Sequence, residues 1–574
     1  MTDSYRGVPA APGVAAGTAV VIGRAVDRGP RDGEALVRAD GGSTSGPQRV
    51  ASSVEEALDA VAMELSALAD RLRVSGHPEE ADIVSVGALI ARDPVLREDA
   101  QGEWQRGADP AEAVLAAADR HAAAIQSLGD ATLRERAADV RQVGRRAAAF
   151  LRGAAPAAAE EPVILVADEL GPAEIMGLDG GAVAGGVAVR GGPNSHAAIV
   201  ARSLRIPLVL GVPAEILLVA EGAPVLVDGS AGIVTVEPGQ PELRAVQAAM
   251  DRAVSRREAL AGERGLPCVT IDGHSVSLLC NVSTRAETIA GLEAGAEGVG
   301  LLRTELPFLE SGRWPSEAEH RAALEPILSL LEGRVATVRV LDFGGDKVPP
   351  FLADAMSEVP GIGARGLPAL LTTPGALQSQ LRAALDAGRN SRLRILVPMV
   401  TSLREVRLAR EALEEAAADE GAEKPDIGVM VEVPSAALIA DRLAQEVDFI
   451  SIGTNDLTQH VLGVSRRDPS ARPSLAAHPS LLALINRVVR SGAAHGRTVG
   501  VCGEAGGDPL VLPLLVGIGV GALSVSPAMV DEVRSQVRSL SFESCQAAVR
   551  EALAMDSVEE VWALVAERFP RDAP

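Results

Sequence analysis

The chain has 574 residues and a formal net charge of −23; 47% of its residues are hydrophobic and 23% are charged. This length and composition predict a globular protein of several domains. The excess of acidic residues argues against nucleic acid or an anionic membrane as a partner, although a local group of arginines could still bind an anionic small substrate.

Short apolar runs separated by turns predict a small α/β domain. The run 13–22 (GVAAGTAVVI) is typical of a strand, and similar runs resume after an Ala- and Pro-rich stretch. We expect residues 1–32 and 153–237 to form this domain. The later runs are 163–167, 186–189, 208–211 and 225–229.

Between these two parts the pattern is helical. The segment 53–56 (SVEE) has the form of a capping box. Apolar residues then recur at alternating spacings of four and three, which predicts one face of a long amphipathic helix. Three more helices are predicted, one through residues 83–90, one beginning at Pro110 and one from about Asp130. We expect residues 33–152 to form an inserted all-α subdomain. The face of the first helix is made by Val54, Leu58, Val61, Leu65, Leu68 and Leu72.

The remainder of the chain is the most regular part. Residues 238–264 are charged and helical in pattern, which predicts a helical linker. Residues 265–574 contain eight apolar runs, most of them separated by helical patterns, and eight such units predict a (β/α)₈ barrel. The predicted fold class is therefore multidomain α/β with a C-terminal barrel. The runs are Val276–Val282, Gly298–Arg303, Ala336–Leu341, Ile395–Met399, Ile427–Val433, Phe449–Gly453, Thr498–Cys502 and Ala522–Val525.

The sequence contains few signs of membrane insertion or secretion. The uncharged run 509–530 is long enough to suggest a membrane span, but its prolines and glycines favour a short buried helix, a turn and a strand. The four cysteines match no zinc or disulfide spacing, and the first residues lack a signal-peptide pattern. We therefore expect a cytoplasmic protein with no membrane insertion.

The segment 191–199 (GGPNSHAAI) delivers His196 to the first turn of a predicted helix. Backbone N–H groups at a helix N-terminus favour an anion, and glycines allow it to approach closely. An imidazole placed there could carry a phosphoryl group. On local sequence alone, a histidine that merely caps the helix explains the pattern equally well.

Polar residues follow most of the barrel runs, where the active site of such a barrel is built. Glu432 and Asp456 end consecutive runs and could hold Mg²⁺, although an acid–base pair or ion pairs with arginines would explain them too. Arg303, Arg339 and Arg466 could clamp a phosphate and a carboxylate.

Cys502 ends the run 498–502. A buried structural cysteine is the usual interpretation of such a position. At the end of a barrel strand the thiol could instead donate a proton.

Several segments together resemble the phosphoenolpyruvate-utilising enzymes. Residues 192–207 are similar to the phosphohistidine segment of these enzymes, and five segments are similar to their barrel. In order and spacing they most resemble the phosphoenolpyruvate–protein phosphotransferase family, the enzyme I family of the bacterial sugar phosphotransferase system. The barrel segments are GLLRTE (300–305), RVLDFGGDK (339–347), VMVEVP (429–434), SIGTNDLTQ (451–459) and CGE (502–504).

The resemblance implies a role for each matching residue. His196 would be the phosphorylated nucleophile, and Cys502 would protonate the enolate carbon as pyruvate forms. Mg²⁺ would be bound by Glu432 and Asp456. The all-α subdomain would dock the carrier protein HPr, and the barrel would join two chains in a homodimer. Phosphoenolpyruvate would be held by Arg303, Arg339, Asn455, Asp456 and Arg466.

The chain departs from the family pattern at three places. Asn194 stands where the family commonly has threonine, Val359 where it commonly has asparagine, and Arg467 and Asp468 where glycine and asparagine are common.

Three competing functions are compatible with parts of the sequence. A dikinase or synthase of the same superfamily would need a nucleotide-binding domain that this length does not accommodate. A catalytically weak regulatory paralogue is the second competing function. A barrel lyase acting on oxo-acids is the third, and it leaves the histidine domain unexplained.

Overall fold

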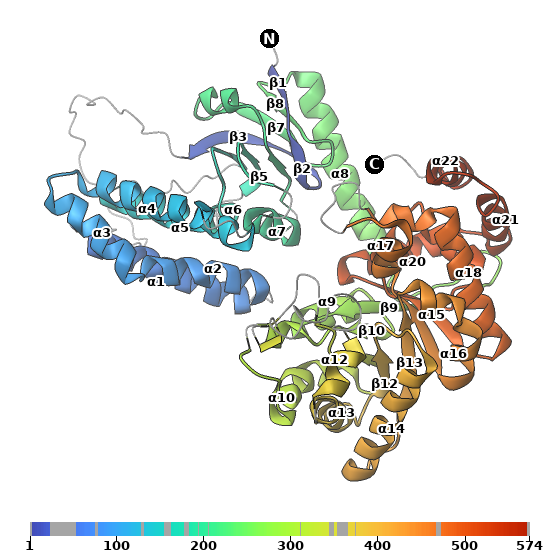
Figure 1. The fold of residues 1–574 in the computed structure, drawn as a ribbon. Coiled ribbons are helices and arrows are strands. Elements are labelled where there is room, and N and C mark those ends of the chain that lie inside the picture. The colour runs from blue at the N-terminus through green and yellow to red at the C-terminus, as the bar shows by residue number, and fades with distance from the viewer. Residues whose placement is uncertain are drawn as a thin grey trace, which may run out of the picture. The chain divides into compact units, whose positions relative to one another are not determined.

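The computed structural model divides into two compact units, one of residues up to Val254 and one from Ser255 onward (Figure 1). It describes residues 3–22, 53–74, 78–127, 131–153, 162–176, 183–192, 195–204, 206–309, 311–343, 349, 351–352, 366–373, 375–465 and 472–570.

An eight-stranded mixed sheet forms the centre of the first unit, in the order β1-β8-β7-β3-β4-β5-β6-β2. Strands β3 to β6 run parallel, and antiparallel pairs complete both sides. β4 is buried along its whole length, as its run of apolar residues predicts. The strands are β1 (Asp3–Arg6), β2 (Val8–Ala11), β3 (Val14–Ile22), β4 (Val163–Ala167), β5 (Val183–Ala188), β6 (Leu208–Leu210), β7 (Pro224–Asp228) and β8 (Ile233–Val236).

Five helices lie in the described residues between β3 and β4. The first is confirmed as predicted: Ser53 Oγ accepts from the Glu56 N–H at 3.2 Å, and all six apolar residues of the predicted face are buried. Helix α3 was not predicted, because few of its residues are buried and its apolar period is weak, although Asp93 caps it and Pro94 begins it. The helices are α1 (Val54–Val74), α2 (Pro78–Ala91), α3 (Pro94–Gln105), α4 (Pro110–Ser127) and α5 (Ala131–Leu151).

Short helices follow β4 and β5 in the first unit, and a long one leaves it. The long helix α8 falls in the region whose charge pattern predicts a helix, and it carries the chain from the first unit into the second. These elements are α6 (Pro172–Ile175), α7 (His196–Ser203), η1 (Ala214–Leu218) and α8 (Gln240–Gly262).

A closed barrel of eight parallel strands forms the second unit, which confirms the predicted barrel. Each of the eight apolar runs overlaps one strand, although β11, β12 and β13 begin one to three residues before the predicted run. The strands are β9 (Ser277–Val282), β10 (Gly298–Leu302), β11 (Val335–Arg339), β12 (Arg392–Val397), β13 (Asp426–Val431), β14 (Phe449–Ile452), β15 (Thr498–Val501) and β16 (Ala522–Val525).

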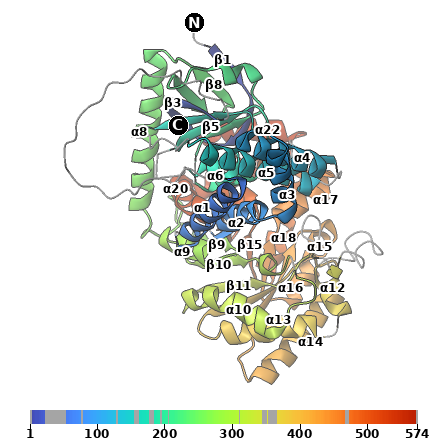
Figure 2. The ribbon, with the colours of Figure 1, turned by 90° about the vertical axis from the view of Figure 1, so that its left-hand side faces the viewer.

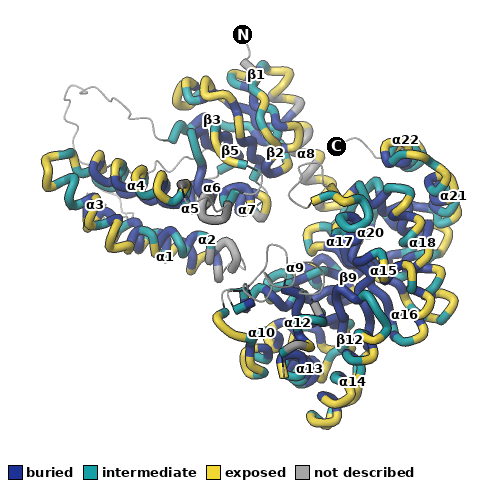
Figure 3. The backbone as a smooth tube through the Cα atoms, viewed as in Figure 1, coloured by how far each residue is buried: buried dark blue, intermediate teal, exposed yellow. Residues whose placement is uncertain are grey.

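Helices surround this barrel, with α10, α13 and α14 on its outside in both views (Figures 1 and 2). The strands are mostly buried, and exposed residues lie on the outer faces of the helices (Figure 3). The helices are α9 (Arg285–Glu293), α10 (Glu317–Leu328), α12 (Gly366–Thr372), α13 (Ala376–Ala387), α14 (Leu403–Glu420), α15 (Pro434–Leu438), α16 (Ala440–Glu446), α17 (Thr454–Leu462), α18 (Pro479–Ala494), α19 (Leu512–Ile518), α20 (Val530–Ser539), α21 (Phe542–Ala552) and α22 (Val558–Arg568). Short 3₁₀ turns are η2 (Leu306–Phe308), η3 (Ser329–Leu331), η5 (Pro473–Ala477), η6 (Glu504–Gly507) and η7 (Pro527–Met529).

Side chains fill the interior of the barrel. Gly428 lies against the ring of Phe449, since a Cβ at this glycine would come within 2.5 Å of ring atoms. The guanidinium of Arg394 stacks over the same ring at 5.2 Å. The barrel is therefore a packed core that supports its rim. The interior cluster comprises Leu301, Leu396, Met430, Phe449 and Cys502.

The uncharged run at 509–530 is buried in the second unit as a helix, a turn and a strand, as the sequence predicts. Helix α19 ends at Gly519, whose φ of +91° lies in the region that favours glycine, and β16 follows. Within the described ranges, no helix has both the length and the apolar character that crossing a membrane requires.

Candidate active site

His196 is the first residue of α7, as the glycine-rich turn predicts. Ser195 caps the helix, because its Oγ accepts from the Ala198 N–H at 3.3 Å. Gly191 has a φ of +121°, a backbone conformation that residues with a side chain rarely adopt. The histidine thus lies at a helix N-terminus, where backbone N–H groups favour an anion. Residues 193–194, including the atypical asparagine, lie outside the described part of the chain.

The ring of His196 faces a carboxylate that the sequence analysis did not identify. Its Nδ1 lies 3.2 Å from Oδ2 of Asp139 on α5, and the two side chains are 14% and 4% exposed. Arg136 Nη1 donates to the same oxygen at 3.3 Å. Asp139 could have been noticed in the sequence as an acidic residue on the apolar face of an amphipathic helix.

At the barrel rim, Glu432 directly follows β13 and Asp456 lies in the first turn of α17, and both are buried. Glu432 Oε1 accepts from the Met399 N–H at 2.7 Å. Met399 has a φ of +56°, which is uncommon for a residue with a side chain. Burial, together with Asp342 and Asp456, raises the pKa of Glu432 from 4.5 to about 8. Burial and the two neighbouring carboxylates therefore disfavour the ionised form of Glu432.

Arg339 ends β11 and supplies a cation at the rim, with its side chain 12% exposed. Its Nη2 donates to Glu305 Oε1 at 2.9 Å, and its Nη1 lies 3.8 Å from Asp342 Oδ2. Burial alone would lower the pKa of Arg339, but Glu305, Asp342 and Glu432 outweigh it and raise the pKa. Within the described residues, the buried Nε of Arg339 has no hydrogen-bond partner. A buried donor without an acceptor is typical of a group that a ligand would satisfy.

A buried glutamine on α13 holds the segment that follows β11. Gln380 Oε1 accepts from the Leu341 N–H at 2.9 Å, and its Nε2 donates to Thr304 Oγ1 at 3.0 Å. Thr304 in turn donates to the carbonyl of Arg339 at 3.0 Å. These bonds fix the backbone from which Arg339 projects. Gln380 was not among the predicted site residues, although a polar residue on the apolar face of a helix can be recognised from the sequence pattern.

Cys502 lies at the top of the filled interior and is 3% exposed. Burial raises the pKa of its thiol to about 11, so the thiol is protonated at neutral pH. Asn281 Nδ2 donates to the carbonyls of Cys502 and Ser524 at 2.9 and 3.0 Å, and Ser524 Oγ returns a bond to Asn281 Oδ1 at 2.7 Å. This satisfied network fixes the backbone that carries the thiol.

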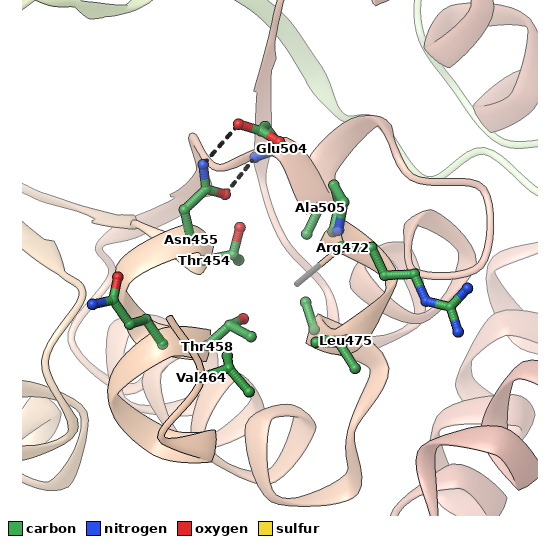
Figure 4. Close-up of a pocket in the computed structure, with 11 residues that line it drawn as sticks. Thr454, Asn455, Thr458, Val464, Arg472, Leu475, Glu504 and Ala505 are labelled. Carbon is green, nitrogen blue, oxygen red and sulfur yellow. Dashed lines mark hydrogen bonds between the residues drawn. The ribbon is translucent and has the colours of Figure 1, made fainter. Parts of the chain in front are cut away.

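Asn455 lies beside Asp456 and is held by a reciprocal pair of bonds (Figure 4). Its Nδ2 donates to Glu504 Oε1 at 3.1 Å, and its Oδ1 accepts from the Glu504 N–H at 3.0 Å. Both residues line a cavity of 190 Å³ between α17, η5 and η6. Arg303 follows β10 at the same end of the barrel and is partly buried. Arg466 lies outside the described residues.

The donor set at the rim fits Mg²⁺. In the part of the chain that the structure describes, no group of three His, Cys, Asp or Glu residues could hold a metal by itself. Mg²⁺ usually takes one or two carboxylates and completes its octahedron with substrate oxygens and water. Glu432 and Asp456 supply two such carboxylates, and a divalent cation beside them would favour the ionised form of Glu432, which burial and the neighbouring carboxylates disfavour.

Comparison with known proteins defines the class. Three family models match successive parts of the chain: "PEP-utilising enzyme, N-terminal" at residues 6–136, "PEP-utilising enzyme, mobile domain" at 159–232 and "PEP-utilising enzyme, PEP-binding domain" at 257–542. The second contains His196, and the third contains the barrel rim. The chain therefore has the successive domains of a phosphoenolpyruvate-utilising enzyme.

Individual relatives narrow this class. The phosphoenolpyruvate-protein phosphotransferase of Streptomyces coelicolor is 37% identical over 98% of both chains, and that of Bacillus subtilis is 33% identical over 90% of this chain and 93% of its own. The multiphosphoryl transfer protein of Rhodobacter capsulatus is 38% identical over 87% of this chain, which spans only 61% of that longer protein. The chain belongs to the phosphoenolpyruvate-protein phosphotransferase family, as the sequence motifs predict.

Proposed function

We propose that this chain takes the phosphoryl group of phosphoenolpyruvate onto His196, releases pyruvate, and passes the group to a histidine of the carrier protein HPr. The observation that carries the proposal is the buried set of charges at the barrel rim. Glu432 and Asp456 supply carboxylates there, and Arg339 supplies a cation with an unsatisfied donor. These groups suit a substrate that bears both a phosphate and a carboxylate.

Binding would use the rim arginines and Asn455. Arg303, Arg339 and Arg466 would hold the phosphate and the carboxylate, and Asn455 would add an oriented amide. Mg²⁺ held by Glu432 and Asp456 would neutralise charge on the transferring group. Positioning and charge neutralisation are the main demands of phosphoryl transfer.

Transfer would begin with the lone pair of His196 Nε2. A bond forms between Nε2 and phosphorus as the bond from phosphorus to the enol oxygen breaks, and the electron pair leaves with that oxygen as an enolate. Because His196 and the rim belong to different units, these units must come together for this step. The thiol of Cys502, protonated because of its raised pKa, would then give its proton to the enolate carbon to form pyruvate.

The remaining proposals concern partners. The helices α1–α5 would form the surface on which HPr docks, and the barrel would join two chains in a homodimer. We expect the protein to act in the cytoplasm. These three proposals rest on the resemblance to the family. The residues that match the three family models lie in both units of the chain.

One labelling experiment tests the central proposal. The full chain is incubated with Mg²⁺ and phosphoenolpyruvate carrying ³²P, without nucleotide, and then with HPr. We expect acid-labile label on the wild type, no label on His196→Ala, and passage of the label to HPr. Asp168→Asn is the matched control, since it alters an exposed ion pair of the same unit.

Each outcome of this experiment points to a different function. A requirement for ATP and phosphate would indicate a dikinase. No label on a folded sample would indicate a regulatory paralogue. Label that persists in His196→Ala would refute the assignment of the nucleophile.

A further inference from the structure

The helix α5 presents a buried polar stripe to the α/β part of the first unit. Asp139, Gln142 and Arg146 follow one another at spacings of three and four, so they share one face of the helix. Their relative exposures are 3%, 5% and 6%. Three buried polar residues on one face are costly unless each has a defined partner.

Two of the three have partners in the segment around α6. Arg146 Nη2 donates to the Ala173 carbonyl at 3.1 Å. Gln142 lies so close to Gly171 that a Cβ there would come within 2.3 Å of the amide carbon. Arg145, beside the stripe, forms an ion pair with Glu174 at 3.2 Å. These contacts hold α5 in a fixed position against the α/β part.

The partner of the third residue is His196. Asp139 Oδ2 lies 3.2 Å from Nδ1 of His196 and also accepts from Arg136. Within the described residues, the other carboxylate oxygen of Asp139 is buried and has no hydrogen-bond partner. An ionised carboxylate can only accept, so the hydrogen of the neutral imidazole must lie on Nδ1. The lone pair is then on Nε2.

We propose that Asp139 is a positioning residue that fixes His196 in the Nδ1–H tautomer and so makes Nε2 the attacking nitrogen. The effect on phosphoryl transfer rests on the proposed function, whereas the contact between Asp139 and His196 does not. Isolated neutral histidine rings favour the opposite tautomer, with the hydrogen on Nε2. Without the carboxylate, most neutral rings would therefore lack a lone pair where the new bond must form.

The same contact helps during the transfer itself. As Nε2 bonds to phosphorus, positive charge develops on the ring and the Nδ1–H becomes a stronger donor to Asp139. The proton stays on Nδ1, and the electron pair of the broken bond leaves with the enol oxygen, so no other acid or base is needed at the histidine. The aspartate of a Ser-His-Asp triad acts on its histidine in this way. The helices α1–α5 would therefore have two roles: they would form the proposed docking surface, and α5 would supply the residue that orients His196.

The test is the ring tautomer of His196, measured by ¹⁵N NMR on the full chain at about pH 8.5, where histidine rings are mostly neutral. The His196→Ala spectrum identifies its signals among those of the eight histidines. We expect the Nδ1–H form in the wild type and a shift toward Nε2–H in Asp139→Asn. The control is Asp59→Asn, which removes an aspartate paired with Arg97 and should change nothing.

A kinetic measurement gives the second readout. Asp139→Asn should slow phosphorylation by phosphoenolpyruvate about tenfold or more, in line with the effect of placing a histidine in the wrong tautomer, while Asp59→Asn keeps the wild-type rate. A wild-type ring in the Nε2–H form, or an unchanged tautomer in Asp139→Asn, would overturn the inference. The wild-type spectrum decides even where the variant fails to fold. A wild type with the Nδ1–H form that takes no label would instead refute the proposed function alone.

Discussion

Replacing Glu432 by glutamine should remove the pH dependence that this residue imposes on the barrel in the absence of metal. The folded state raises the pKa of Glu432 from 4.5 to about 8 through burial and the nearby carboxylates of Asp342 and Asp456. Glutamine has nearly the same shape, keeps an oxygen that can accept from the Met399 N–H, and carries no charge to bury. It therefore removes the titration and retains the packing.

The sign follows from the two protonation states. Below pH 4.5 the carboxyl is protonated in both the folded and the unfolded chain. Between pH 4.5 and about 8 the unfolded chain has released the proton and the folded chain still holds it, so the free energy of unfolding falls as the pH rises. The loss is about 1.4 kcal/mol per pH unit, or about 4 kcal/mol between about pH 5 and pH 8. Relative to the wild type, Glu432→Gln should gain this amount over that interval.

The assay is urea unfolding in EDTA, followed by tryptophan fluorescence. In a Trp104→Phe background the two remaining tryptophans, Trp314 and Trp562, both report on the second unit. Subtracting wild type from variant at each pH cancels the contribution of titrating groups that do not interact with Glu432. Glu504→Gln, which alters an exposed carboxylate at the same rim, is the matched control.

A difference between variant and wild type that stays flat from pH 5 to pH 8 would refute the reasoning. Adding Mg²⁺ at pH 8 should stabilise the wild type and leave Glu432→Gln nearly unchanged, because the variant has lost a ligand. Equal stabilisation of both chains would show that Glu432 holds no metal.

Three further substitutions test separate features. Cys502→Ala should slow pyruvate formation from phosphoenolpyruvate while the histidine still accepts phosphate from phosphorylated HPr, and equal loss in both assays would exclude the proton-donor role. Gly171→Ala should lower the free energy of unfolding of the first unit by about 1–3 kcal/mol, since the added methyl group overlaps the Gln142 side chain; chemical denaturation measures this, and an unchanged midpoint would contradict it. Gln380→Leu leaves a buried backbone N–H without its acceptor and should cost about 1–3 kcal/mol in barrel stability. It should also lower kcat/KM for phosphoenolpyruvate, and an unchanged kcat/KM would mean that this network does not support the rim.

The barrel and the start of α7 could be predicted because their signals are local. Each strand is a continuous apolar run, and the turn before His196 is written in consecutive glycines. The catalytic end of the barrel follows from the fold itself, so Glu432, Asp456 and Cys502 could be placed at one rim without coordinates.

Asp139, Gln380 and Met399 could not be predicted in the same way. Asp139 meets His196 across 57 positions of sequence, and Gln380 reaches the backbone of the segment after β11 from a helix outside the barrel. Met399 acts through its N–H and a positive φ, neither of which its side chain reveals. These contacts depend on how distant elements pack, and a single sequence carries no direct record of that packing.

The filled barrel interior constrains the path of protons. Phe449 at the beginning of β14, with Leu396 and Met430 around it, blocks the end of the barrel opposite the rim. If Cys502 is the proton donor proposed above, its proton must be replaced from the rim side, through the space that the substrate and product would occupy. Reprotonation of the thiol would then depend on departure of the product, so one exit would serve both pyruvate and the proton supply.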